Sequence, residues 1–199
     1  MHCLKPYRFV LRYIITASLV LLLSCNSVET SKANDYEVVS AFINSLIKEV
    51  IDENGKLPID TLYINDSSVV FKDIQKYAEN TNIEKLGISE ELFKNFITLN
   101  SSRYCFSMKF DIHLHYRLIS ESEIDEFNNS KVKSAKFQDW VKAGGVKYIS
   151  RVGFSKDYNE ALFYYGGYAA PLAASGYLIH MKKDKNGWVV ISENLLWVS

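Results

Sequence analysis

The sequence predicts an α+β domain in which N-terminal helices pack on a curved antiparallel sheet formed mainly by a C-terminal meander. Helical periodicity dominates the first half of the chain, whereas the last third alternates short apolar runs with turn residues. Helices that come first and strands that come last are typical of the α+β class. The chain shows no internal repeat and no second domain boundary, so residues 35–199 are expected to form one domain.

The strongest helix signal lies over residues 35–53, where apolar residues recur at steps of three and four. Asn34 followed by Glu37 indicates a capping box at its start, and Asn54-Gly55 a stop. The apolar stripe consists of Val39, Phe42, Ile43, Leu46, Ile47 and Val50. One face of this helix is therefore expected to be buried.

Shorter elements are predicted between this helix and the last third. Residues 57–71 favour extended structure, and short helices are expected over 72–80 and 89–99, the second opened by Ser89. Residues 104–119 show the clearest strand pattern, because polar and apolar side chains alternate. Two further short helices are expected, one starting at Ser120 with Glu123 and one marked by Phe137, Trp140 and Val141 and ended by Gly144-Gly145.

Four strands are predicted in the last third, over residues 148–155, 161–168, 176–183 and 188–193, the last extended by 195–198. The turn Asp184-Lys185-Asn186-Gly187 contains Asn-Gly between apolar runs. This pair favours a type I′ hairpin turn, whose two central residues both need positive φ. Sequential strands with short turns indicate an antiparallel meander.

The first 24 residues have the pattern of an export signal. Lys5, Arg8 and Arg12 precede an apolar run from Tyr13 to Leu23, and no acidic residue occurs before Glu29. Eleven apolar residues suit the ~7–15-residue core of a signal peptide, whereas a membrane-spanning helix needs about 20.

The run ends in Leu22-Leu23-Ser24-Cys25, which resembles the lipobox of bacterial lipoproteins. The resemblance implies cleavage before Cys25, a diacylglyceryl group on its sulfur and palmitate-type acyl chains that hold the protein on a membrane. Two or three such chains anchor stably, whereas one binds only marginally. Leu23 departs from the family, where a smaller residue is usual. An ordinary cleaved signal peptide and a short uncleaved anchor remain alternatives.

Residues 25–34 are rich in Ser, Thr and Asn and are expected to form a flexible tether. Asn26 follows the cysteine at the position where, by family analogy with enterobacteria-like systems, inner-membrane retention would favour Asp. The predicted location is therefore the bacterial cell envelope, with the outer membrane favoured over the inner membrane.

Composition excludes one class of partner. Without residues 1–24 the chain has 20 basic and 23 acidic residues, a net charge of −3. Nucleic-acid binding needs a clear basic excess, so no nucleic-acid partner is expected. Cys105 is the last cysteine once Cys3 and Cys25 are set aside, and its aromatic neighbours favour a buried, inert thiol over a nucleophile.

One pattern has the residue types of a metal site. His113 and His115 are two apart on a predicted strand and would point to the same side, about 7 Å apart along the chain. Asp111 or the distant His180 would supply a third ligand. Histidines also occupy the wet face of a strand without binding anything, and that alternative remains open. No cofactor is predicted.

Three residues are candidates for ligand binding: Arg151, Tyr168 and Ser175. Arg151 can grip a carboxylate or phosphate through two hydrogen bonds, or it can pair with Glu160 on the next strand. Tyr168 and Ser175 lie in the Gly- and Ala-rich stretch over residues 166–176. This stretch lacks the strand-to-helix context of a phosphate loop and is expected to be a connection that contacts a partner.

A second resemblance covers roughly residues 147–193. It is carried by Ser150-Arg151-Val152-Gly153-Phe154-Ser155, Ala161-Leu162-Phe163-Tyr164-Tyr165, Ser175-Gly176-Tyr177-Leu178 and Asn186-Gly187-Trp188-Val189-Val190. These segments resemble a group of uncharacterised exported lipoproteins of Bacteroidota. Those relatives often carry Cys-x-x-x-Cys in the Gly-rich connection, where this chain has Ala169 and Ala173, so a redox role of that pair is absent here. The resemblance implies the sheet and a bacterial origin, and no activity.

The sequence favours a binding or interaction module of the cell envelope over an enzyme. Its partner would be an envelope protein or a small molecule, with envelope stress, toxin neutralisation and glycan uptake as contexts. The alternative is an envelope hydrolase that uses a metal held by His113 and His115. No Gly-x-Ser-x-Gly nucleophile motif occurs.

Overall fold

The computed structural model describes residues 35–51, 55–78, 83–129, 141–170 and 173–199. Tyr36–Ser199 form one compact unit. Among the described residues, none of the helices combines the length and the apolar character needed to cross a bilayer. The elements in chain order are the helix over residues 35–50, β1 (Thr61–Asn65), α2 (Phe71–Ala78), the 3-10 helix η1 (Glu84–Leu86), α3 (Glu90–Leu99), β2 (His115–Ile119), α4 (Glu121–Asn129), β3 (Val146–Ile149), β4 (Gly153–Phe154), β5 (Glu160–Ala170), β6 (Ala173–Asp184) and β7 (Gly187–Val198).

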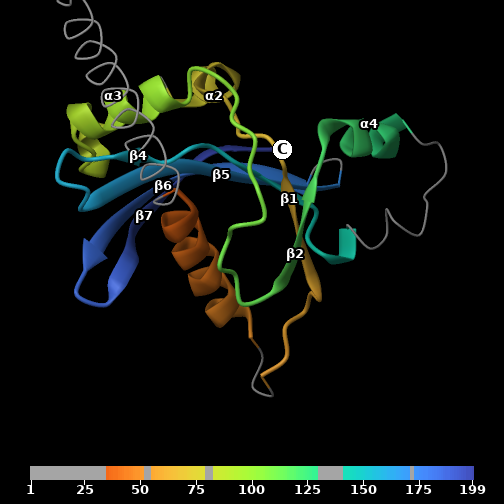
Figure 1. Cartoon of the computed structure of the whole chain (residues 1–199). Coiled ribbons are helices and arrows are strands. Elements are labelled where there is room, and N and C mark those ends of the chain that lie inside the picture. The colour runs from red at the N-terminus through yellow and green to blue at the C-terminus, as the bar shows by residue number, and fades with distance from the viewer. Residues whose placement is uncertain (1–34, 52–54, 79–82, 130–140, 171–172) are drawn as a thin grey trace, which may run out of the picture. The chain divides into compact units, whose positions relative to one another are not determined.

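In the described part of the chain, seven strands form one mixed sheet in the order β2-β1-β3-β5-β6-β7, with β4 pairing β5 (Figure 1). The α+β class and the C-terminal meander β5-β6-β7 are confirmed. The sheet is not antiparallel throughout, because β1 runs parallel to both β2 and β3. Parallel neighbours need a long crossover connection. The segment with α2 and α3 provides the first crossover, and the segment with α4 provides the second.

Helices cover both faces of the sheet (Figure 1). The 35–50 helix, orange in the figure, buries Val39, Phe42 and Ile43 against one face. Helices α2 and α3 pack on the opposite face, where Leu92 and Phe96 are fully buried. Because strand residues alternate between faces, each long strand contributes to both cores.

The 35–50 helix has the predicted apolar stripe. Phe42 is buried and its ring contacts Phe163 and Tyr165 edge-on, with centroid distances of 5.4 and 5.0 Å. Val50, the last predicted member of the stripe, is exposed at the end of the helix. Asn34 and residues 52–54, which carry the predicted start and stop signals, lie outside the described residues.

The sequence predicts a strand over residues 104–119, but within that range the structure has a named strand only over His115–Ile119 (β2). Side chains of the 35–50 helix bind the backbone before it. The Asp111 N–H donates to Ser40 Oγ at 2.9 Å, and the His113 N–H donates to Asn44 Oδ1 at 2.8 Å. Backbone donors satisfied in this way have no need of a sheet partner.

Residues 166–170 and 173–176 are strand rather than connection, since β5 continues to Ala170 and β6 begins at Ala173. The hairpin between β6 and β7 is confirmed, but its type I′ turn is wrong. Gly187 has a φ of 123°, whereas Asn186 does not have positive φ. The Asn186 N–H donates to Asp184 Oδ1 at 2.6 Å, which stabilises the turn without left-handed residues at its centre.

Helix α4 begins with the predicted capping box. The Glu123 N–H donates to Ser120 Oγ at 3.3 Å, and the Ser120 N–H donates to Glu123 Oε2 at 3.2 Å. The predicted cap of α3 is also present, because the Leu92 N–H donates to Ser89 Oγ at 3.2 Å. The cap of α4 places Glu121 at the first position of the helix, beside the pocket described next.

Candidate functional site

A pocket of about 750 Å³ opens on the face of the sheet that α2 and α3 cover. Its volume falls in the ~300–1,000 Å³ range of small-ligand sites. The described lining comes from α2, α4, β3, β5, β7 and the loops between elements, and five of its thirteen residues are aromatic. The lining residues are Ser67, Ser68, Val69, Asp73, Ile74, Tyr77, Arg103, Glu121, Tyr148, Tyr164, Gly167, Tyr168 and Trp197.

Paired glycines set the position of two aromatic side chains in this pocket. Gly166 on β5 lies opposite Gly176 on β6. A Cβ at either position would come within 2.5 Å of the Tyr164 hydroxyl, and one at Gly176 would lie 2.4 Å from Trp197 Nε1. The two glycines therefore leave the space in which Tyr164 and Trp197 lie against the sheet. The ring of Tyr77 from α2 packs against Trp197 at 5.8 Å.

The polar atoms of Tyr164 and Trp197 bind each other, because the Trp197 indole N–H donates to the Tyr164 hydroxyl. Burial raises the pKa of Tyr164 to about 12, against a smaller lowering effect of that hydrogen bond. Tyr164 is only 4% exposed, so this pair offers a ligand mainly the partly exposed ring of Trp197 rather than free polar atoms.

Tyr148 and Tyr168 present hydroxyl groups to the same pocket. Among the described residues, neither hydroxyl makes a hydrogen bond. Burial, followed by the negative charge of Glu121, raises the pKa of Tyr148 to about 12. The Tyr148 hydroxyl is therefore neutral at ordinary pH, and it can both donate and accept a hydrogen bond.

An ionic network forms part of the pocket wall. Arg103 Nη1 donates to Glu121 Oε1 at 3.1 Å, and Nη2 lies 4.0 Å from Asp73 Oδ2. The buried Asn65 side chain donates to the same Glu121 oxygen at 3.0 Å. Each charged side chain of the network is about half exposed, so it can also contact a molecule in the pocket. The network holds α2, the Arg103 loop and α4 around the pocket.

The lining has the groups needed for binding, and its two serine hydroxyls make hydrogen bonds within the protein. Ser67 Oγ donates to Asp66 at 3.0 Å, and Ser68 Oγ accepts the Tyr104 N–H at 2.9 Å. The described lining contains no histidine. Its hydroxyl, carboxylate and guanidinium groups can recognise a small molecule through hydrogen bonds.

The predicted metal ligands lie at the β2 edge of the sheet. His115 begins β2, and Asp111 and His113 precede it; all three are exposed. Within the described ranges, no three or more His, Cys, Asp or Glu side chains gather closely enough to hold a metal ion. A metal site at these residues stays a prediction. Among the described residues, no third ligand lies near the two histidines.

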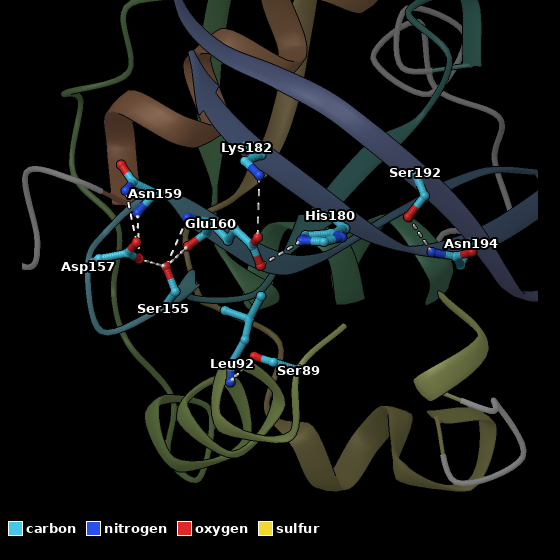
Figure 2. Close-up of polar contacts among 10 residues, drawn as sticks. All are labelled: Ser89, Leu92, Ser155, Asp157, Asn159, Glu160, His180, Lys182, Ser192 and Asn194. Atoms are coloured by element: carbon cyan, nitrogen blue, oxygen red, sulfur yellow. Dashed lines mark hydrogen bonds and ion pairs between the residues drawn. The ribbon is translucent and has the colours of Figure 1, made fainter. Parts of the chain in front are cut away.

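His180 lies elsewhere, on β6 beside Glu160 of β5 (Figure 2). It is buried, and its Nε2 is 3.5 Å from Glu160 Oε2, while Lys182 Nζ is 3.9 Å from Glu160 Oε1. Ser192 pairs with His180 across the β6–β7 ladder, but its Oγ accepts a hydrogen bond from Asn194 at 3.0 Å. His180 makes no hydrogen bond among the described residues, so no Ser-His-Glu relay forms here.

Of the three predicted ligand-binding residues, only Tyr168 lines the pocket. The Arg151 guanidinium lies over the ring of Tyr104 at 5.1 Å, and Glu160 forms its ion pairs with His180 and Lys182. Ser175 lies on the same side of β6 as Tyr177, which packs on the opposite core. Arg151 and Ser175 therefore contribute no side chain to the described lining. Cys25 lies outside the described residues.

The prediction that Cys105 is buried is wrong, because its side chain is exposed. Phe106, its neighbour in sequence, is buried. The aromatic neighbours therefore indicated a buried segment, and the alternation along the chain turned the thiol outward.

Most of the pocket residues are not predicted from the sequence. One usable signal was present, since Tyr164, Gly166 and Tyr168 alternate along one strand and must share a face. The glycine between two tyrosines marks a place where another group approaches the backbone. Nothing local distinguishes Arg103, which reaches the pocket from a loop, or Trp197 near the end of the chain.

Comparison with known proteins finds no relative of this chain. No protein-family model, no curated protein and no solved structure matches it.

Proposed function

We propose that this chain is an exported protein, held on a bacterial membrane by a lipid on Cys25, whose folded domain binds a small molecule in the pocket between the sheet and helices α2 and α4. The basic leader, its short apolar run and the Leu22-Leu23-Ser24-Cys25 motif support export and lipidation. The pocket supports binding.

The observation that carries the binding proposal is the mixed character of the pocket wall. The partly exposed ring of Trp197 lies in the same wall as Tyr148 and Tyr168, whose hydroxyls make no hydrogen bond among the described residues. Pockets that combine a mostly apolar wall with a few placed polar groups are typical of ligand sites. Polar groups left without protein partners inside such a wall are available to a ligand.

The alternative is an envelope hydrolase that uses His113 and His115. It would need a third protein ligand, and among the described residues the two histidines have no such partner near them. The binding function is therefore favoured.

Thermal unfolding in the presence of ligands tests the binding proposal. The full-length protein is screened against water-soluble sugars, amino acids, nucleosides and short fatty acids. A ligand that binds only the folded state at a hundred times its Kd stabilises by about 2.7 kcal/mol. At least one compound is expected to raise the Tm, and Trp197→Ala should abolish the rise. The proposal is wrong if no compound acts, or if each acts equally on the variant.

Metabolic labelling with a fatty-acid analogue tests the anchor. The wild-type protein is expected to carry the label in the membrane fraction, and Cys25→Ala should lose both the label and the membrane association. An unlabelled protein in the cytosol with its leader intact would contradict the proposed location.

A further inference from the structure

The groups around the pocket include both hydrogen-bond donors and hydrogen-bond acceptors. The guanidinium of Arg103 has five N–H donors, of which one is used on Glu121 in the described structure. The Asp73 and Glu121 carboxylates provide acceptors, and the Tyr148 hydroxyl provides one donor and one acceptor site. A matching ligand would have groups that both donate and accept, as alcohol hydroxyls do.

Charge argues against an anionic ligand. The described lining has one cationic side chain, Arg103, and two carboxylates, so its net charge is negative. A phosphate or carboxylate ligand would add a further negative charge. Both carboxylates face the same guanidinium, which reduces their attraction for an organic cation.

Hydrogen bonding argues against a purely apolar ligand. A fatty acyl chain could cover the ring of Trp197, but it would bury the hydroxyls of Tyr148 and Tyr168, which have no hydrogen-bond partner among the described residues. Burying a polar group without a hydrogen bond is costly. The ligand therefore needs polar groups along one side and an apolar surface along another.

From these constraints we infer that the pocket binds the neutral, hydroxyl-rich rings of a saccharide. The C–H face of a sugar ring packs on the partly exposed ring of Trp197, and its hydroxyl groups bind Tyr148 and the Arg103 network. A volume of about 750 Å³ is large enough for an oligosaccharide. This inference rests on the proposed binding function and assigns its ligand class.

Isothermal titration calorimetry of the full-length protein tests the inference. The neutral probes are mono- to trisaccharides of glucose, galactose, mannose, xylose and N-acetylglucosamine. The comparison probes are choline, inorganic phosphate and laurate. At least one neutral saccharide is expected to bind. Its Kd should be nearly unchanged between low and high salt, because no charge pairs with it.

Tyr148→Phe is the decisive variant, because it removes one hydroxyl and keeps the ring. Loss of one hydrogen bond is expected to raise the Kd about tenfold. Tyr177→Phe is the matched control, since Tyr177 packs on the opposite core, and it should leave the Kd unchanged. Trp197→Ala should weaken binding at least as much, and circular dichroism checks that both variants are folded.

The outcomes separate the inference from the proposed function. If choline, phosphate or laurate binds in a Tyr148-dependent manner and no saccharide does, the ligand class is wrong and the pocket remains a binding site. If a saccharide binds but Tyr148→Phe and Trp197→Ala have no effect, the assignment to this pocket is overturned. If no probe of any class binds, both proposals fail.

Discussion

Helix α3 approaches the sheet so closely that it leaves no room for a side chain at Gly153. An added Cβ would lie 2.6 Å from both the Cα and the backbone nitrogen of Phe96. An ordinary contact begins near 3.4 Å, so the helix would have to retreat by roughly 0.8 Å. No rotamer change relieves this contact, because the neighbouring atoms belong to the backbone.

The cost of Gly153→Ala follows from what α3 buries. Leu92 and Phe96 are fully buried, and burial of each stabilises the fold by about 1.5–3 kcal/mol. A gap of 0.5–1 Å forfeits about a quarter to a half of the contact energy. The expected loss is therefore about 1–3 kcal/mol, the usual range for overpacking. The same shift would stretch the 2.8 Å hydrogen bond from the Phe154 N–H to Asn95.

Gly167→Ala is the matched control. Its added Cβ would meet Lys147 Nζ at 3.2 Å, and the end of a lysine side chain can move aside. The substitution also restricts the unfolded chain, which stabilises by about 0.4–1 kcal/mol. Urea unfolding followed by tryptophan fluorescence measures both variants. Equal loss of stability in the two, or none in Gly153→Ala, would refute the close-packing argument.

Three further predictions concern pH, a buried amide and a helix cap. Burial raises the pKa of Tyr148 and Tyr164 to about 12 from 10.0, so the folded protein keeps protons that the unfolded chain releases. These two groups should not change the free energy of unfolding below pH 10, and that free energy should fall between about pH 10 and 12. The fall should be smaller in Tyr148→Phe than in the wild type. Midpoints of urea unfolding measured against pH test this. Asn100→Ala should cost about 2–4 kcal/mol in urea unfolding, because the buried Asn100 side chain bonds both the N–H and the C=O of Arg151, at 2.8 and 3.0 Å; a loss below 0.5 kcal/mol would contradict this role. Ser120→Ala should cost about 1 kcal/mol and speed amide hydrogen exchange in α4 and nowhere else, whereas unchanged exchange there would show that the cap does not hold the helix.

Local patterns were sufficient for the elements that they describe. The three- and four-residue spacing of Val39, Phe42 and Ile43 identifies a helix with one buried face, and the described helix buries all three. Ser89 and the pair Ser120–Glu123 identify two helix starts. Each signal lies within a few residues of the structure that it specifies, so no distant contact was needed to interpret it.

Local patterns failed where a distant segment competes for the same backbone groups. The alternation over residues 104–119 is real, yet Ser40 and Asn44 of the first helix take the backbone donors of Asp111 and His113. The parallel pairing of β1 with β2 and β3 also joins segments far apart in sequence. Periodicity specifies which side chains share a face and carries no information on which strand lies beside which.

By itself, the sequence determined the α+β class, the C-terminal meander and the caps of α3 and α4, because those depend on spacing within short segments. It also carries the leader and the Cys25 motif on which the proposed export rests. Only the tertiary structure decided the pocket, since Arg103, Tyr148 and Trp197 come from three separate segments. The physical reason is that strand register and helix docking bring those side chains together, and both result from the packing of the whole domain rather than from any local run of residues.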